Sequence, residues 1–284
     1  MERGKRAVYK VLSALKKAAA NLFVILISFT CVFPIIWLIY STLKTSAEFD
    51  TNVIALPVNP TLDNYKKVLT VSSMPKYMLN SVMISVITVM LILVTSFVIG
   101  YFLARYDFRF RNLIYGGFLI GMLIPIHSLM VPIYIIFSKL HINDHRFTLV
   151  IPYLAFQMPI ALYLMENYIH SIPREMEEAA AIDGASFDMR LFRIVLPMAK
   201  PVMTAAGIIA FFYCWNEFSF ALILTTRETL RTLPLGLALF KGSYTTNYPM
   251  LMAAMAIAIA PALVTYMLFS KNIIKGMMSG AVKG

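Results

Sequence analysis

Long apolar segments separated by short polar ones dominate this chain of 284 residues. Six of the segments are about as long as the ~20 residues that an α-helix needs to cross the ~30 Å of hydrocarbon in a bilayer. They span approximately residues 18–42, 80–104, 113–137, 147–166, 202–224 and 249–270. Each run is continuously apolar and does not alternate with polar residues, which indicates helices and argues against a membrane β-barrel. The pattern therefore predicts an all-α membrane protein with six transmembrane helices.

Composition supports this assignment, since 60% of the residues are hydrophobic and only 14% are charged, against roughly 25% charged in a soluble domain. The first apolar segment follows a basic stretch and could be taken for a signal peptide. It is too long for the apolar region of a signal peptide, however, and no clear small-x-small cleavage pattern precedes Lys44. We therefore expect this segment to remain in the protein as a membrane helix.

Positive charge is unevenly distributed over the segments between the predicted helices. If the N-terminus is cytoplasmic, 16 of the 25 Lys and Arg residues lie on the cytoplasmic side, as the positive-inside rule expects. This orientation makes residues 1–17 a basic cytoplasmic segment, residues 18–270 the transmembrane domain and residues 271–284 a cytoplasmic tail. The net charge of +11 is then a topology signal, and we predict no nucleic-acid partner.

Two features inside the predicted helices refine this interpretation. Pro125 and Pro132 lie within the third segment, where each proline removes a backbone donor, so we expect this helix to be bent. Cys31 and Cys214 both lie in apolar segments. Two thiols without His partners at ligand spacing suggest neither a metal site nor a disulfide framework.

The polar segment at 167–201, between the fourth and fifth apolar segments, carries signals for two short helices. Pro173 suits the first turn of a helix. Acidic residues follow it, where they favour the positive end of the helix dipole; they are Glu175, Glu177 and Glu178. Gly184 is a natural C-terminal cap for this helix, and Ser186 is an N-cap for the next one, which we expect Pro197 to end. The segment should form a helix, a glycine turn and a second helix on the cytoplasmic face.

Very small side chains cluster on the first of these helices and on its turn. They are Ala179, Ala180, Ala181, Gly184 and Ala185. Small residues let another backbone approach closely, while the neighbouring carboxylates offer charge pairing at the rim. An ordinary solvated loop would need neither the two capped helices nor the small residues. The segment is therefore typical of a docking site for a partner.

The stretch EEAAAIDGASFDMRLFRIVLPMAKP, from Glu177 to Pro201, closely resembles the EAA motif in permease subunits of binding-protein-dependent ABC importers. The matching positions have the spacing of the motif and are Glu178, Ala179, Ala180, Gly184, Ile194, Leu196 and Pro197. The longer sequence SIPREMEEAA, together with Asp183, is similar to the motif of the carbohydrate-uptake branch, in particular that of the maltose-type second permease subunit. NPTLDNY before the second apolar segment, FxxxWNEF within the fifth and the terminal SGAVKG agree with this branch, so the resemblance extends over nearly the whole chain.

This resemblance implies the type I ABC importer permease fold, with six transmembrane helices and both termini in the cytoplasm. It also implies that the EAA segment is a coupling helix, seated in a cleft of a separate ATPase. The residues that would contact the ATPase are Glu178, Ala179, Ala180, Asp183, Gly184 and Ala185. By this resemblance, Glu178 would face basic groups of the cleft, the alanines would fill it, and Gly184 would permit the sharp turn.

The partners that the resemblance implies are two ATP-binding subunits, a second related permease, an extracytoplasmic solute-binding protein and a sugar, at the cell membrane of a prokaryote. The chain contains no G-x-x-x-x-G-K-[ST] phosphate loop, so ATP and magnesium would be bound by the partner ATPase and not by this chain. We therefore predict a transport subunit in the lipid membrane, with no catalytic residues and no cofactor of its own.

Two stretches are candidates for contacts on the outer side. Glu217 is the one acid well inside an apolar segment, and with Trp215 and Asn216 it could supply the carboxylate, ring and amide that a sugar needs. Alternatively, Glu217 pairs with a neighbouring helix and Trp215 anchors the outer interface. By resemblance, a glycine-containing loop after the fifth segment faces the binding protein, and its tip would be formed by Gly242, Ser243 and Tyr244.

Three other functions have weaker support. A permease of the same class could carry a polyamine, phosphate or a peptide, because the sequences of the loops do not identify the transported solute. A stand-alone secondary transporter would be expected to show paired intramembrane acids or two related halves, and the sequence shows neither. A membrane enzyme would need a nucleophile and a base at reachable depths, for which His127 without an obvious partner is weak support.

Overall fold

A computed structural model of the chain describes residues 2–243 and 247–281, with side chains described for Ser13 and for residues 15–239 and 247–269. These residues form helices and turns, and they include no strand. The chain divides into two compact units, residues 1–71 with 244–256 and residues 72–243 with 257–284.

The helices of the first unit are α1 (Glu2–Ser41), α2 (Ser46–Thr51), α3 (Asp63–Thr70) and the start of α13 (Tyr248–Ala281). The second unit contains α4 (Met74–Arg105), α5 (Arg111–Gly121), η1 (Ile126–Leu129), α6 (Met130–Lys139), α7 (Val150–Ser171), α8 (Glu175–Ile182), α9 (Phe187–Met189), η2 (Arg190–Val195), α10 (Leu196–Asn216), α11 (Ser219–Leu224), η3 (Glu228–Leu230), α12 (Leu233–Ser243) and the rest of α13.

Among the described residues, four helices are long and apolar enough to cross a membrane. They are Leu15–Ser41, Met74–Arg105, Phe187–Asn216 and Tyr248–Phe269. The pair α5 and α6 adds a fifth if the two helices form one broken span. The predicted fourth segment is a helix, α7, but it is less apolar than these. It packs against α4, α5 and α10, so its buried Gln157 and Glu166 face protein and not lipid.

The third predicted segment is not one helix. α5 ends at Gly121, and η1 and α6 resume at Ile126 with a bend of 96° between the two parts. The expected bend is thus confirmed, but it is a full break. The physical reason is Pro125, which disfavours helical backbone at the residue before it. Pro132 lies in the first turn of α6, where its missing N–H costs nothing.

The fifth predicted segment, 202–224, is shifted in the structure. Its helix begins at Phe187 and runs through η2 into α10. The prediction that Pro197 ends the second helix of the polar segment is therefore wrong. In η2 the backbone takes wider π-helical turns, and the N–H of Leu196 donates to the carbonyl of Leu191. Such a turn accommodates a proline within a continuous helix. At the other end, α10 stops at Asn216 and the separate α11 follows.

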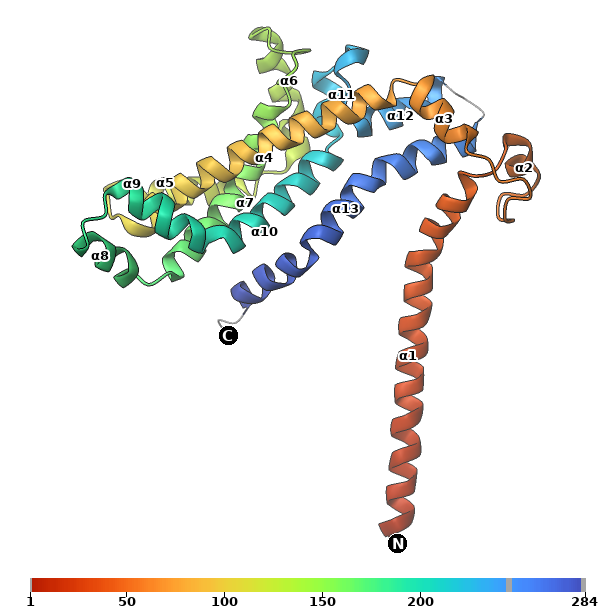
Figure 1. Cartoon of the computed structure of the whole chain (residues 1–284), viewed down its shortest axis with the longest axis horizontal. Coiled ribbons are helices and arrows are strands. Elements are labelled where there is room, and N and C mark those ends of the chain that lie inside the picture. Colours follow the sequence, from red (N-terminus) through yellow and green to blue (C-terminus); the bar gives the residue numbers. More distant parts are fainter. Residues whose placement is uncertain (1, 244–246, 282–284) are drawn as a thin grey trace. The chain divides into compact units, whose positions relative to one another are not determined.

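The core of the second unit is formed by α4, α7 and α10, which lie along one another in Figure 1. Two glycines allow this close packing. A Cβ atom on Gly100 of α4 would lie 3.1 Å from the Cβ of Met165 on α7, and a Cβ on Gly207 of α10 would lie 3.3 Å from Leu93 on α4. The buried residues around these contacts are mainly aliphatic and aromatic, so van der Waals packing holds the three helices together.

At the other end of α4, Gly236 of α12 lies against the ring of Tyr77. A Cβ atom on Gly236 would come within 2.1 Å of that ring. The ring is not free to move, because the Tyr77 hydroxyl donates to Glu228 at 3.0 Å. Hydrogen bonds from Ser73 and Tyr77 lower the pKa of Glu228 below its usual value, which keeps this acceptor charged.

We expect Gly236→Ala to destabilise the protein, because the added methyl overpacks a site whose neighbour is held in place; such changes cost roughly 1–3 kcal/mol. The measurement is the midpoint of thermal unfolding of the purified protein in detergent. Gly117→Ala is the matched control, since no atom lies within 4 Å of its added Cβ. Equal midpoints for the two variants would contradict the close contact.

Candidate functional site

The predicted docking segment forms α8 and α9, which lie together at one end of the second unit in Figure 1. α8 begins at Glu175 with Arg174 as its N-cap, so Pro173 precedes the helix and does not lie in its first turn, contrary to the prediction. Gly184 has the positive φ of +84° that only glycine adopts without strain. The N–H of Gly184 donates to Ala181 at 3.1 Å and that of Ala185 to Ala180 at 2.9 Å, which is the paired hydrogen bonding of a glycine C-cap.

The start of the next helix also has the predicted cap. The Ser186 hydroxyl accepts a hydrogen bond from the N–H of Met189 at 3.3 Å. The helix, the glycine turn and the second capped helix are therefore present as predicted, apart from the continuation of the second helix past Pro197. The two caps define the turn closely, so α8 is held as a short rigid helix and not as a solvated loop.

Glu177 attaches α8 to the end of α4. Its carboxylate is buried, accepts a hydrogen bond from the Tyr101 hydroxyl at 2.7 Å and pairs with Nε of Arg105 at 2.6 Å. Arg105 also donates to the carbonyl of Ile172 at 3.0 Å, and Arg174 donates to the carbonyl of Ala104 at 3.3 Å. These contacts connect both sides of the α7–α8 turn to α4.

This role of Glu177 was not predicted from the sequence, in which Glu177 and Glu178 both appear only as charges that favour the helix dipole. One signal was available: Tyr101 and Arg105 are four residues apart, so on a helix they share a face. Nothing in the sequence indicates, however, that this face meets α8 across more than 70 residues of chain.

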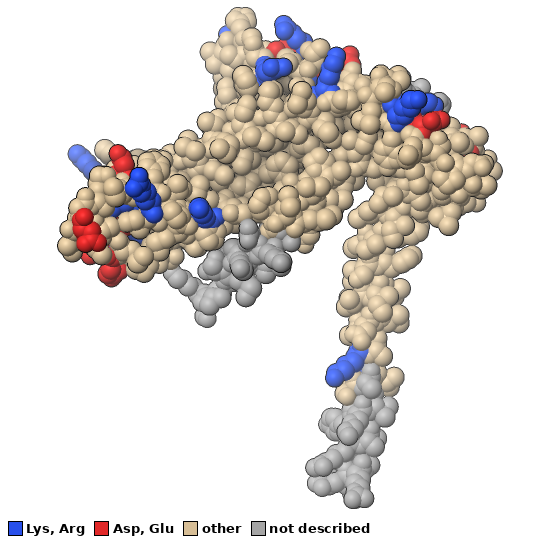
Figure 2. Space-filling view, in the orientation of Figure 1, with Lys and Arg blue, Asp and Glu red and all other residues tan. Residues whose placement is uncertain are grey.

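A second ion pair stabilises the same end of the unit. Arg111, at the start of α5, donates to Glu166 of α7 at 3.1 Å and to the carbonyl of Leu103 of α4 at 2.6 Å. Figure 2 shows acidic and basic side chains gathered at this end, whereas the flanks of the helices in view are almost free of charge. The end that carries α8 is therefore polar, and ion pairs and hydrogen bonds connect its helices.

The exposed part of α8 contains most of the residues predicted to contact an ATPase. Glu178, Ala179, Asp183 and Gly184 are exposed, while Ala180 and Ala185 are half-buried. Ile182 belongs with them, since 87% of its surface is exposed, more than that of any other large apolar residue described. We call Glu178, Ala179, Ile182 and Asp183 the α8 face. Ile182 thus adds an exposed apolar side chain to the charged and small residues of this face.

The three predicted pathway residues do not converge on one site. Trp215 is buried, and its Nε1 donates to the carbonyl of Ala258 on α13 at 3.2 Å. Glu217 is buried, and its carboxylate accepts hydrogen bonds from the N–H groups of Phe220 at 2.7 Å and Ala221 at 3.3 Å. Glu217 therefore caps α11 at the break after α10. Only Asn216 has an exposed side chain.

The predicted binding-protein loop is largely helical. Gly242 and Ser243 lie in the last turn of α12, and Tyr244 lies outside the described residues. The segment before α12 is bonded to α4, since the amide of Asn80 donates to the carbonyls of Thr229 and Arg231. Gly242 and Ser243 are therefore part of a helix and not the tip of a loop.

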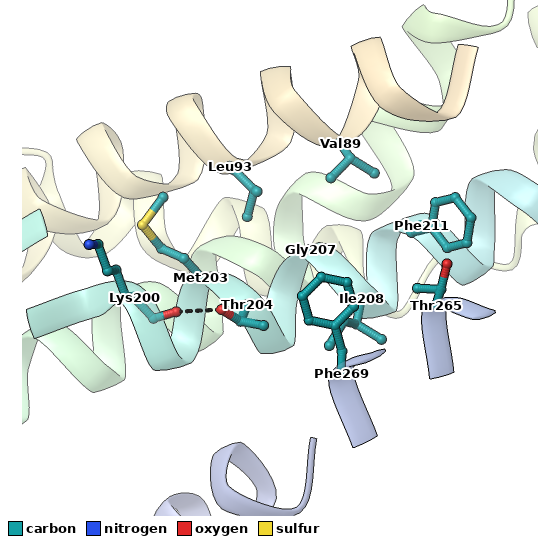
Figure 3. A pocket seen from close by; sticks show the side chains of 10 residues that line it. All are labelled: Val89, Leu93, Lys200, Met203, Thr204, Gly207, Ile208, Phe211, Thr265 and Phe269. Atoms are coloured by element: carbon teal, nitrogen blue, oxygen red, sulfur yellow. Dashed lines mark hydrogen bonds between the residues drawn. The ribbon is translucent and has the colours of Figure 1, made fainter. Parts of the chain in front are cut away.

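A cavity of about 420 Å³ lies between α4, α10 and α13 in the second unit (Figure 3). It is lined mainly by apolar side chains, with Lys200 as the one charged lining residue. The hydroxyl of Thr204 donates to the carbonyl of Lys200 at 2.8 Å and that of Thr265 to Pro261 at 2.8 Å. Because these hydroxyls are used within their own helices, the cavity lacks the convergent polar groups that a sugar site needs.

Among the residues that the structure describes, no group of three or more His, Cys, Asp or Glu side chains could hold a metal ion.

Comparison with known proteins is consistent with these features. Residues 96–278 match the family model of the binding-protein-dependent transport system inner membrane component. The chain is 38% identical over 252 residues to a putative ABC transporter permease protein, ORF2, of a Caldicellulosiruptor species, covering 88% of this chain and 91% of that protein. It is 32% identical over 275 residues to the trehalose/maltose transport system permease protein MalG of Thermococcus litoralis, covering 95% and 98% of the two chains.

The fold is similar to that of a chain in the crystal structure of a bacterial ABC transporter involved in the import of the acidic polysaccharide alginate. The TM-score is 0.79, and the match covers 90% of this chain and 96% of that chain. The two sequences are only 22% identical, so this comparison shows a shared fold.

We expect Glu177→Ala to loosen α8 from α4, because it leaves the buried Arg105 and Tyr101 without their acceptor. Removing one partner of a buried ion pair costs roughly 3–5 kcal/mol, so amide hydrogen exchange across residues 173–189 should become at least tenfold faster. Glu175→Ala is the control, since Glu175 is exposed on the same helix. Unchanged exchange in Glu177→Ala would show that the pair does not hold α8.

Proposed function

Because the chain belongs to the family of binding-protein-dependent transport system inner membrane components, we propose that it is the membrane-spanning permease subunit of an ATP-driven sugar importer. It forms half of the translocation pathway and couples to a separate ATPase through α8. The observation that carries this proposal is the structure of α8 itself, which is capped, bonded to α4 through Glu177 and exposed along the α8 face. The chain is a transport subunit and not an enzyme.

The ATPase receives the α8 face in a cleft. Glu178 and Asp183 pair with basic groups at the rim, and Ala179 lets the wall of the cleft approach the helix backbone. Ile182 fills an apolar hollow, since burying such a side chain contributes roughly 1.5–3 kcal/mol. ATP and magnesium are held by that partner. Ala180, Gly184 and Ala185 shape the turn beside the contact.

Force passes from α8 into the membrane helices through Glu177. When two ATPase subunits close on ATP, they displace α8, and the Glu177–Arg105 pair transmits the displacement to α4. Because α4 packs along α7 and α10, these helices follow it. The permease pair then changes from inward-facing to outward-facing, and ATP hydrolysis resets it.

The topology that fits this role has six crossings with both termini in the cytoplasm. α1, α4, α13 and the helix from Phe187 to Asn216 supply four, and the broken pair α5 and α6 supplies another. α7 supplies the remaining one, since its 22 residues extend ~33 Å at 1.5 Å per residue. This places the α8 face on the side that carries most Lys and Arg residues, as the positive-inside rule expects.

The partners follow from the family, whose members depend on a binding protein. A solute-binding protein delivers sugar on the outer side, where the end of α12, with Gly242 and Ser243, faces it. A second, related permease completes the pathway, and the complex resides in the cell membrane of a prokaryote. A resolved complex of the alginate transporter with its pentasaccharide-bound periplasmic protein supports this arrangement by analogy.

Sugar is favoured as the solute because relatives of the chain include a trehalose/maltose permease. Polyamines, phosphate, peptides and a stand-alone secondary mechanism are not favoured by any observation here. Among the predicted pathway residues we assign sugar contact to Asn216, because it is the one whose side chain is exposed. Trp215 and Glu217 instead stabilise the helices around it.

We expect Glu178→Lys and Ile182→Glu each to reduce co-purification of the ATPase with the tagged permease at least tenfold. The first change opposes basic groups in the cleft, and the second places a charge where an apolar side chain is buried. Uptake by intact cells should fall to a similar extent, while the amount of permease in the membrane stays unchanged.

Glu175→Lys is the matched control for the same charge reversal on α8, and it should retain most uptake. Normal uptake and normal co-purification in both test variants would refute docking through the α8 face. Loss of uptake with full co-purification would instead place the defect in force transmission.

A further inference from the structure

We propose that the loop of residues 53–62 is a lipid anchor, which rests in the bilayer interface beside the end of α1 that is remote from Lys17. The loop has the sequence VIALPVNPTL and carries no charged residue. It follows α2 in the first unit and returns to the end of α1, in the part of Figure 1 around α2. The proposal requires α1 to cross the bilayer, but it does not depend on the solute or on the ATPase.

The depth of the loop follows from its bonds to α1. Nε1 of Trp37 donates to the carbonyl of Val53 at 3.1 Å, and the Tyr40 hydroxyl donates to the carbonyl of Ile54 at 2.5 Å. Trp37 lies about 20 residues, or ~30 Å, along the helix from Lys17, which equals the hydrocarbon thickness of a typical bilayer. With Lys17 at one interface, Trp37 and the bonded loop lie at the other.

The side chains of the loop suit this depth. Ile54, Leu56 and Val58 are 67%, 71% and 80% exposed, so the rest of the first unit does not cover them. Exposed apolar residues that are close together in a loop mark a contact with lipid or with another protein. Trp37 and Tyr40 are the residue types that are enriched where a helix leaves the bilayer.

Several backbone groups of the loop form hydrogen bonds within the protein and so do not depend on water. The carbonyl of Val53 accepts from Trp37 and from the Lys44 ammonium, and the N–H groups of Ile54 and Ala55 donate to the side chain of Asn52 at 3.1 and 3.0 Å. Further along, the N–H of Asn59 donates to Glu48 at 2.9 Å. These bonds satisfy part of the non-helical backbone, whose polar groups would be costly to leave unpaired at the membrane.

Lipid is the occupant that the surroundings favour. The span of α1 from Leu15 to Ser41 has none of its apolar window buried, and its bonds to the loop make the two surfaces continuous. A soluble binding protein would approach from the water side, above the level of Trp37. The anchor would hold the depth and tilt of a helix that packs little within its own unit.

Depth measurements on the full-length protein in its transporter complex test the proposal. In a Cys31→Ser, Cys214→Ala background, single cysteines replace Leu56 and Val58 and are labelled with a fluorophore sensitive to polarity. Asp50→Cys, at an exposed position of α2, is the aqueous control, and Ile27→Cys in the apolar span of α1 is the lipid control. The complex is reconstituted into phosphatidylcholine vesicles with or without brominated acyl chains.

We expect brominated lipid to quench the labels at positions 56 and 58 at least threefold more strongly than the label at position 50. Quenching equal to that at position 50, together with access to aqueous iodide, would overturn the proposal by placing the loop in water. Protection from iodide without quenching by lipid would also overturn it, because the loop would then contact another protein. Neither result would affect docking through the α8 face, which is tested by co-purification.

Discussion

The carboxylate of Glu177 is buried between two donors on α4, the Tyr101 hydroxyl and the Arg105 guanidinium. Removing such a charge from water costs several kcal/mol, and only close hydrogen-bond geometry offsets that cost. The contact therefore tolerates little change in the position of α8 relative to α4. A short helix at the end of the unit thereby becomes a rigid extension of a 32-residue membrane helix.

The rest of the second unit preserves this connection by close packing. Gly100 brings α4 against α7, and Gly207 brings α10 against α4. α7, enclosed by these helices, can carry the polar Glu166, whose charge is paired with Arg111. A displacement of α4 must therefore move its neighbours, because a close-packed interior transmits strain and does not absorb it.

Helix interruptions give this packed unit its shape. The break before Pro125 separates α5 from α6, and the π-helical turns of η2 carry the chain past Pro197 without a break. At the break between α10 and α11, the carboxylate of Glu217 accepts hydrogen bonds from N–H groups at the start of α11. A residue that would be costly in an apolar helix thus satisfies backbone groups that lipid would leave unpaired.

Local patterns in the sequence determined the helical class, most of the membrane segments, the capped helices around Gly184 and the family, because hydropathy, glycine and capping residues act within a few neighbours along the chain. They indicated that Pro125 would bend its helix and that small residues would surround Glu178. Only the tertiary structure decided that Glu177 is bonded to α4, that Ile182 stands exposed and that Glu217 faces backbone and not a cavity. Each of these features depends on which helix surfaces pack against one another, and the periodicity of the sequence does not contain that information.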